Sequence, residues 1–459
     1  MKNTLFKKVL AVALACTMTF SMATVTHAAD AKEITIGVTS FADTLEPTEQ
    51  YFSWVVSRYA IGECLTKFDE NGEIVPCLAE SWENSEDGKT WTFKIREGVK
   101  FSNGDDMTPE MVMASIQRTA DKSDRVPEFF DLDSMEVDGQ NLIFHLNRAN
   151  ANMAGSLADP LFLIVDTNVD DSTFAMEGPI CTGPYAVSEY VSEEKIELVA
   201  NENYWDGAPE IKSITVKNIG SDTKVDAMLS GDIDLAQGPD ATALNRVENN
   251  DDINIVKVTG TRENDFELNC REGNPLSDKN LRLALSYAVD RDVVAQVAGN
   301  GYSSPISTAF PPSVGYDSED VNGQVYDLDK AKECLEAAGY SDSDGDGIVD
   351  KDGENLSLTI SIANGSSTAV SETLQDMWKQ IGVDVQIEML ENVSDKRASG
   401  DFDMLVSPNW QTVNAGDGQK YLMNRWSDGG SDNYSGYHSD EFQSVLDKLD
   451  AAFTQEDRV

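Results

Sequence analysis

Histidine is scarce in this sequence, which holds only His27, His145 and His438 among its 459 residues. Because imidazole suits nickel and zinc, the chain is poorly supplied for a bare transition-metal site. His145 falls in an alternating apolar segment, where a structural role is commoner than a ligand role. Enzyme patterns such as H-E-x-x-H, G-x-S-x-G, G-x-x-x-x-G-K and G-x-G-x-x-G are also missing. We therefore expect a protein that is not an enzyme, and an exported hydrolase is the least favoured alternative.

Basic residues are few beside the acidic ones, 35 Lys and Arg against 81 Asp and Glu, for a net charge of -46. Nucleic-acid binding needs a basic surface, so nucleic acid is excluded as a partner. An acidic surface draws cationic solutes, although solubility is the commoner reason for one. With so many acids, carboxylate pairs arise by chance and do not by themselves indicate catalysis.

Long apolar runs are missing beyond the N-terminus, and no later segment approaches the roughly 20 apolar residues that span a bilayer. At the N-terminus, three lysines precede an apolar run, and Thr26-His27-Ala28 offers small residues for cleavage. This pattern is typical of a secretory signal peptide, residues 1–28, cleaved after Ala28. Ala13-Leu14-Ala15-Cys16 resembles a lipobox, so a lipid anchor on Cys16 is the second alternative. We expect the mature protein in the periplasm or at the cell surface.

Cysteine is limited too, and five residues remain beyond the predicted signal peptide: Cys64, Cys77, Cys181, Cys270 and Cys334. If residues 69–72 form a hairpin turn, Cys64 and Cys77 lie opposite each other on paired strands. A disulfide between them and two buried free thiols both fit this arrangement. Five is an odd number, so at least one thiol has no partner within the chain.

Apolar periodicity divides the chain into two parts. In the first, alternation predicts strands at 34–39, 91–96 and 142–146, and Thr108-Pro109 marks a helix start. Residues of about 65–165 therefore form an antiparallel sheet with helices, inserted into a larger unit. We assign 29–265 to a first lobe that contains this subdomain.

The second part, 266–459, is assigned to a second lobe. Ser277 is expected to cap a helix that ends at Gly299, and 356–363, 370–381 and 383–390 read as strand, helix and strand. That βαβ unit requires parallel strands with a right-handed crossover. Parallel sheets bind ligands outside the carboxyl ends of their strands, here 363–366 and 407–410.

Four motifs in order along the chain carry a family resemblance: residues 76–104 (PCLAESWENSEDGKTWTFKIREGVKFSNG), the run 181–235 with NENYW and SGDIDL, residues 274–294, and the segment around Trp410. Together they resemble the extracytoplasmic solute-binding proteins of ABC importers, in the peptide and nickel class called family 5. Cys181 stands where that family usually has Gly. The resemblance implies an α/β, two-lobed periplasmic-binding-protein fold of class II type, with an α+β subdomain in the first lobe and a ligand cleft between the lobes.

Trp410 is the leading candidate for ligand contact, because a large flat ring at the end of a strand stacks well on peptide or cationic groups. A core tryptophan is the alternative. In the peptide binders that the chain resembles, an Asp shortly after the matching Trp holds the ligand's amino terminus. Here Val413 stands at that place, and Asp417 is the nearest substitute.

Six further residues complete the predicted ligand site: Tyr51, Trp54, Asn269, Asn364, Ser366 and Thr412. Tyr51 and Trp54 follow a loop that borders the cleft in relatives, although Trp54 also fits a helix core. Asn269 falls near the expected crossing between the lobes, where it would hydrogen-bond a peptide backbone.

The resemblance implies that the chain captures oligopeptides and delivers them to a membrane ABC permease, as a monomer that requires no cofactor. Capture of nickel or another metal chelate is the alternative within the same family. The nickel branch holds an anionic chelate with Arg residues near a segment that matches 157–164, and this chain has no Arg there.

One acidic loop matches the first part of an EF-hand. Asp342, Asp344, Asp346 and Asp350 occupy its positions 1, 3, 5 and 9, and Gly347 occupies position 6. Position 12 is Gly353 in place of Glu, and a solvated turn is the alternative to a structural calcium site. Beyond this loop, relatives carry a segment after the helix at 439–453 that returns to the first lobe, and we expect the present sequence to lack it.

Overall fold

The computed structural model describes residues 22–25, 33–70, 72–310, 316, 325–406, 410–413, 416–449, 452 and 455–459. The chain divides into two compact units. The first holds the described residues up to Thr259 together with 416–417 and 452, and the second holds the others from Gly260 onward. This division lies close to the predicted boundary at 265–266. Each unit is described by itself.

Seven strands form the main sheet of the first unit, in the order β13-β1-β12-β2-β11-β10-β9. Their bounds are β1 Met22–Val25, β2 Glu33–Val38, β9 Tyr185–Val191, β10 Lys195–Ala200, β11 Ser213–Asn218, β12 Leu235–Gln237 and β13 Ile253–Val256. β2 pairs in parallel with β11 and β12, so the carboxyl ends of these strands share one edge. Helix α6 (Lys224–Ser230), which joins β11 to β12, ends at Gly231 in the left-handed conformation.

The predicted signal peptide is described only at β1, which pairs antiparallel with β12 and β13. Cys16 lies outside the described residues. In the part of the chain that the structure describes, no helix combines the length and apolarity that a bilayer crossing requires.

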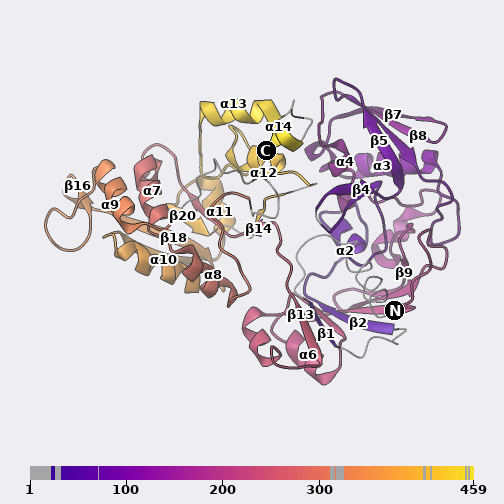
Figure 1. Cartoon of the computed structure of the whole chain (residues 1–459), viewed down its shortest axis with the longest axis horizontal. Helices are drawn as coiled ribbons and strands as arrows, with labels where there is room; N and C mark the ends of the chain where they lie inside the picture. The colour runs from indigo at the N-terminus through magenta and orange to yellow at the C-terminus, as the bar shows by residue number, and fades with distance from the viewer. Residues whose placement is uncertain are drawn as a thin grey trace. The chain divides into compact units, whose positions relative to one another are not determined.

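A four-stranded antiparallel sheet in the order β5-β6-β8-β7 confirms the strands expected within 65–165. Its strands are β5 Ala79–Asn84, β6 Thr90–Ile95, β7 Leu132–Asp138 and β8 Asn141–Leu146. Buried and exposed positions alternate along β8, and its apolar face packs with α3 (Pro109–Lys122). As predicted, the Thr108 side chain caps α3 by accepting a hydrogen bond from the Met111 amide. Figure 1 draws this sheet near β4 and α4, in the same indigo part of the chain.

Shorter elements complete the first unit. They are α2 Ser53–Arg58, β3 Thr66–Phe68, β4 Ile74–Pro76, η2 Val126–Glu128, α4 Met153–Ser156, η3 Pro160–Phe162, η4 Asp171–Thr173, α5 Phe174–Glu177 and η5 Ala241–Arg246. β3 and β4 form the predicted hairpin, and the Leu78 amide bonds to the Cys64 carbonyl beside it. Cys64 and Cys77 are buried free thiols, so the disulfide alternative is not realised in this structure.

The family-like motifs converge on one partly buried carboxyl group, that of Glu63. It accepts hydrogen bonds from Thr182, from the Tyr204 hydroxyl (3.0 Å) and from the Trp205 indole (2.9 Å). Gly183 in the same turn has no room for a side chain, because a Cβ would lie 2.5 Å from the carbonyl oxygens of Ala60 and Ile61. The spacing of the threonine, glycine and tyrosine–tryptophan motifs is therefore a property of the scaffold.

The second unit is built on a four-stranded sheet in the order β15-β20-β18-β19. Its strands are β15 Phe266–Leu268, β18 Ser357–Ala363, β19 Asp384–Leu390 and β20 Met404–Val406. β18 runs parallel to β19 and β20, and α10 (Ala369–Lys379) makes the predicted crossover between β18 and β19. Figure 1 shows α7 and α9 on one side of this sheet, with α8 and α10 on the other.

The helix predicted from Ser277 to Gly299 is wrong in two respects. The structure has two helices, α7 (Lys279–Tyr287) and α8 (Arg291–Gly299), each capped by its own aspartate. Asp278 accepts the first amide bond of α7, whereas the Ser277 hydroxyl donates to the Asn274 carbonyl.

The remaining elements of the second unit are β14 Arg262–Glu263, η6 Pro275–Ser277, α9 Leu328–Ala337, β16 Asp350–Lys351, β17 Glu354–Asn355, α11 Val393–Ser399, β21 Trp410–Gln411, α12 Gln419–Trp426, α13 Asp440–Leu449 and α14 Gln455–Arg458. β14 pairs antiparallel with β21, which places Glu263 directly across from Trp410. This pairing brings the predicted ligand residue beside a segment that starts the second unit.

Candidate functional site

Three carboxylates lie at alternate positions of one extended segment in the second unit. Glu263 ends β14, Glu267 lies in β15 and Asp265 lies between the two strands, and all three carboxyl groups meet side chains of α12. Phe266 and Leu268 pack against the core. Alternation along β15 sends Glu267 to the face opposite Phe266 and Leu268. Glu263 and Glu267 are nevertheless buried.

Helix α12 covers this acidic face. The Arg425 guanidinium donates to Asp265 Oδ2 at 2.9 Å and lies 3.6 Å from Glu267 Oε1. The Tyr421 hydroxyl donates to Glu263 Oε1. Arg425 also stacks 4.5 Å from the ring centroid of Trp410, so one face of that half-buried indole is in contact with a buried cation.

A second guanidinium, Arg397 of α11, completes the cluster with a 2.9 Å bond to Glu267 Oε2. Two buried atoms of the cluster, Asp265 Oδ1 and Arg397 Nη2, have no hydrogen-bond partner among the described residues. An unpaired buried acceptor and an unpaired buried donor are both costly, and a ligand that supplies the missing groups recovers that cost. We refer to Glu263, Asp265, Glu267, Arg397, Trp410, Tyr421 and Arg425 as the Trp410 cluster.

The carboxyl group of Glu263 has an unusual acidity. Burial raises its pKa to about 7, and the negative charge of Asp265 acts in the same direction, against the Tyr421 hydrogen bond and the Arg425 charge. Glu263 is therefore about half protonated near neutral pH. In the same contact, burial and the neighbouring Glu263 charge raise the pKa of Tyr421, so its hydroxyl stays a donor.

Three of the predicted ligand residues in the second unit have structural partners. The Asn269 amide donates to the carbonyls of Gly400 and Phe402, at 3.0 and 2.7 Å. Thr412 is fully buried, and both its amide and its hydroxyl donate to the Thr261 carbonyl. Asn364 donates to Glu391 and is exposed. These bonds give Asn269 and Thr412 a clear scaffold role.

Ser366 is exposed just beyond the carboxyl end of β18, as expected from the parallel sheet. The other predicted strand end, 407–409, lies outside the described residues. Asp417 is buried, but it groups with the first unit whereas Trp410 groups with the second. The suggestion that Asp417 acts beside Trp410 stays a prediction.

In the first unit, Tyr51 and Trp54 flank the start of α2. Tyr51 is 63% exposed, and the Arg125 guanidinium lies 4.2 Å from its ring centroid. The Trp54 indole nitrogen is buried and has no hydrogen-bond partner in the described part of the chain. An unsatisfied indole donor is consistent with a ligand contact, and the predicted role of Trp54 stays open.

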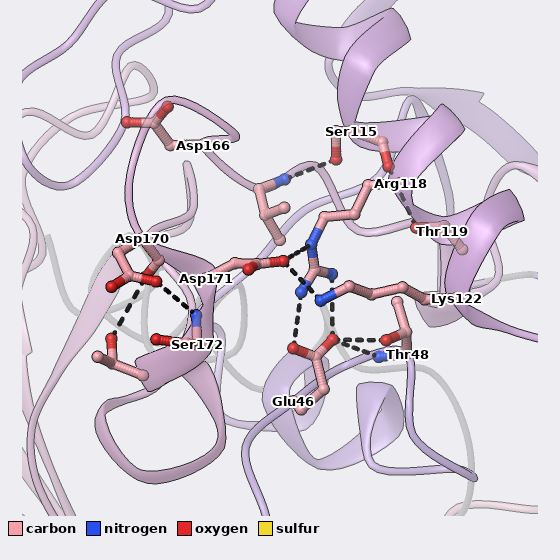
Figure 2. Close-up of polar contacts among 12 residues, drawn as sticks. Glu46, Thr48, Ser115, Arg118, Thr119, Lys122, Asp166, Asp170, Asp171 and Ser172 are labelled. Carbon is pink, nitrogen blue, oxygen red and sulfur yellow. Dashed lines mark hydrogen bonds and ion pairs between the residues drawn. The ribbon is translucent and has the colours of Figure 1, made fainter.

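A buried ion-pair network holds the loop that leads to these two residues. Arg118 of α3 donates two bonds to Glu46, at 3.0 and 2.7 Å, and a third to Asp171 at 2.8 Å. Figure 2 shows the guanidinium between the two carboxylates, with dashed lines from Lys122 to Asp171 and from Thr48 to Glu46. Although burial opposes it, the bonds from Arg118 and Thr48 hold the pKa of Glu46 below its usual value. The network fixes the loop before α2.

The segment 157–164, compared above with the nickel branch, is part of the core. Leu157, Leu161, Phe162, Leu163 and Ile164 are all buried, and Asp159 caps η3. Buried apolar side chains of this kind do not offer a charged chelate a binding partner.

The acidic loop brings together three of its four predicted ligands. One carboxylate oxygen each from Asp342, Asp344 and Asp350 lies within 4.8 Å of the others. Asp346 is instead bonded to the Asn355 side chain at 2.8 Å. Oxygen ligands from carboxylates suit calcium, so these three residues fit that ion, and Asp346 would have to turn to join them.

Comparison with known proteins decides the family. Residues 73–433 match the sequence model of the bacterial extracellular solute-binding proteins, family 5 middle region. The chain belongs to family 5 of the solute-binding proteins. The resemblance found in the four sequence motifs is thereby confirmed.

Two relatives of this solute-binding protein have different cargoes. It is 30% identical over 404 residues to the nickel-binding periplasmic protein of Escherichia coli K12, covering 84% of this chain and 77% of that protein. It is also 30% identical over 369 residues to the oligopeptide-binding protein AppA of Bacillus subtilis, covering 75% and 65%. These similarities place the solute-binding protein in the peptide and nickel class without choosing between cargoes.

A solved structure supports the fold. The nickel ABC transporter structure from Bacillus halodurans superposes with a TM-score of 0.79 at 28% identity, covering 92% of this chain and 88% of that one. The predicted α/β periplasmic-binding-protein fold is confirmed. The solute-binding protein is thus a substrate-binding component of the ABC importer type, as its relatives are.

Sequence reasoning proposed Trp410 but did not name the residues around it. The signal for the acidic face was present as Glu263, Asp265 and Glu267 at every second position, which is the spacing of one strand face. Tyr421 and Arg425 gave a weaker signal, because their spacing of four fits any helix face.

Proposed function

We propose that this solute-binding protein carries oligopeptides, and that Trp410 and the residues clustered around it contact the ligand. The observation that carries the proposal is the pairing of both guanidinium groups in the cluster with carboxylates of the same unit. An anionic chelate would have to compete with Asp265 and Glu267 for those groups. A peptide needs no such exchange.

The two buried atoms of the cluster that lack hydrogen-bond partners also favour a peptide. Asp265 Oδ1 needs a donor and Arg397 Nη2 needs an acceptor. A peptide carries both kinds of group, in its amides and at its termini, whereas an anionic chelate offers acceptors. The half-buried Trp410 ring adds a flat apolar group that suits many side chains.

Nickel or another metal chelate is the second candidate, because one relative at 30% identity is a nickel-binding protein. Against it stand the buried apolar character of 157–164 and the small supply of histidine. The binding site between two lobes, expected from the family resemblance, stays a prediction.

Native mass spectrometry of the protein after mild purification tests the cargo. We expect a spread of adducts with peptide masses. A single adduct with a nickel isotope pattern contradicts the proposal and supports the chelate.

We further propose that the protein delivers its ligand to a membrane ABC permease and acts as a monomer. We also propose that it is exported, because one relative is named a periplasmic protein. Its lipid anchoring through Cys16 is tested separately by mass analysis of the mature N-terminus. A mass that begins after Ala28 supports signal-peptide cleavage, and a diacylglycerol adduct on Cys16 supports the anchor.

We also propose a structural calcium ion in the loop of Asp342, Asp344 and Asp350. The gathered carboxylates support this, together with the EF-hand spacing of the sequence. The ion would stiffen the connection between α9 and β18 and would take no part in ligand capture.

A further inference from the structure

We infer that Glu263 binds the positively charged group of the ligand and releases a proton to solvent as it does so. The inference rests on the proposed function, since it names the residue that binds the ammonium group of a peptide. In chemical terms, the neutral carboxyl group loses its proton, and the carboxylate pairs with the ligand's ammonium group. Each Glu263 that starts protonated releases one proton as it binds one cation.

Position supports this role. Glu263 is directly opposite Trp410 in the β14–β21 ladder, so its side chain lies next to the ring that is expected to contact the ligand. Tyr421 is the only described residue that hydrogen-bonds to its carboxyl group, and it occupies Oε1. A ligand cation at the second oxygen need not displace the tyrosine.

Charge balance supports it as well. The cluster contains three carboxyl groups and two guanidinium groups, Arg397 and Arg425, and both guanidiniums pair with Asp265 or Glu267. No cation is therefore paired with Glu263 in the described part of the chain. A ligand ammonium group would complete the balance.

The charged and titratable groups that face Glu263 all shift its pKa. Asp265, two residues further along the chain, favours the protonated form, and Tyr421 and Arg425 on α12 favour the ionised form. Burial decides the balance, and the pKa of Glu263 reaches about 7. A bound cation adds to the Arg425 effect and expels the proton.

The test uses isothermal titration calorimetry on the full chain at pH 7, in phosphate and in Tris buffer. The probe is a synthetic pool of tri- to pentapeptides with free amino termini, compared with the same pool after N-acetylation. We expect the acetylated pool to bind at least about tenfold more weakly. The free pool should release about half a proton per ligand, seen as a buffer-dependent enthalpy.

The Glu263→Gln variant should remove both the proton release and most of the discrimination against acetylation. Asp265→Asn keeps Glu263 but lowers its proton affinity, so its release at pH 7 should fall. Glu333→Gln, on the exposed face of α9, is the control and should behave like the unmodified protein. Melting curves of all variants report on folding.

The outcomes separate the inference from the proposed function. If both pools bind equally well, or if Glu263→Gln keeps the proton release, the inference is overturned while peptide binding stands. If neither pool binds, the peptide proposal fails and the inference falls with it. Loss of folding in Glu263→Gln leaves Asp265→Asn to decide, because unchanged proton release there also overturns the inference.

Discussion

Arg425 lies with its guanidinium 4.5 Å from the ring centroid of Trp410, and the same guanidinium is bonded to Asp265. The stack fixes one face of the indole within the second unit. The Trp410 side chain as a whole is half-buried, so part of its surface is exposed. The residue thus has a structural contact and a half-exposed surface at once.

Replacement of Trp410 separates these two roles. Trp410→Ala should weaken binding of a peptide pool by about 2 kcal/mol or more, because a central aromatic contact is lost. Trp410→Phe keeps a flat ring and should keep most of the affinity. Calorimetry and thermal unfolding are measured together. Unchanged affinity with a lowered melting temperature in Trp410→Ala would assign the residue to the core alone.

The ion pair between Arg118 and Glu46 should contribute strongly to the stability of the first unit. Arg118→Met leaves Glu46 buried without its cation, which we expect to cost about 3–5 kcal/mol in urea unfolding. Arg148→Met removes an exposed arginine paired with Asp131 and is the control, with an expected change below about 1 kcal/mol. Equal losses in the two variants would contradict the role assigned to the network.

The same pair predicts a loss of stability in acid. Arg118 and Thr48 lower the pKa of Glu46 in the folded state, so the unfolded chain takes up its proton first as the pH falls. The contribution is present above the unfolded pKa and disappears as the pH drops through the folded one. Unfolding of Glu46→Gln should show a smaller loss between pH 5 and pH 3 than the unmodified protein. Parallel pH curves for the two proteins would contradict this.

Lys224 should raise the stability of the first unit as the pH becomes alkaline. Its ammonium group is buried at the carboxyl ends of β2 and β12, where it donates to the Thr39 hydroxyl and the Gln237 carbonyl. Burial lowers its pKa to about 8, so the unfolded chain holds the proton more tightly between pH 8 and about 10.5. Stability contributed by this group should rise over that range. Lys224→Met should flatten the rise, and an unchanged slope would contradict the assignment.

Calcium should stabilise the second unit through the loop of Asp342, Asp344 and Asp350. Addition of calcium after treatment with a chelator should raise the melting temperature by a few degrees, because ligands that bind only the folded state stabilise it. The double variant Asp342→Asn, Asp344→Asn should lose this response. Asp352→Asn, a neighbouring residue outside the gathered carboxylates, should keep it. A melting temperature that ignores calcium in the unmodified protein contradicts the site.

The scaffold was predictable where a local signal sets it. Thr108 before Pro109 marked α3, and alternation marked β6 and β8, because capping and burial act within a few residues. The single helix expected from Ser277 was wrong. Asp278, and not Ser277, caps the first helix, and Asp290 caps a second one. The apolar periodicity continues through both helices and therefore does not reveal the break between them. Cap choice depends on backbone geometry that periodicity does not record.

The candidate site was less predictable, because it depends on contacts distant in sequence. Trp410 could be chosen from its own chemistry. That Glu263 lies opposite it follows only from the pairing of β14 with β21, across about 150 residues of chain. Asn269 and Thr412 have side chains suited to ligands, but these side chains donate hydrogen bonds to backbone carbonyls of the same unit. Residue type shows what a side chain is able to do, and packing decides whether it is available.

The most direct test of the peptide assignment is a pair of titrations on the purified, ligand-free protein. One uses the free-amine peptide pool, and the other uses a nickel–histidine complex, with affinity measured by calorimetry. We expect micromolar or tighter binding of the peptide pool and no saturable binding of the nickel complex. Tight binding of the nickel complex, with no heat from the peptides, would contradict the account and show that the pairing of Arg397 and Arg425 with carboxylates does not exclude an anionic chelate.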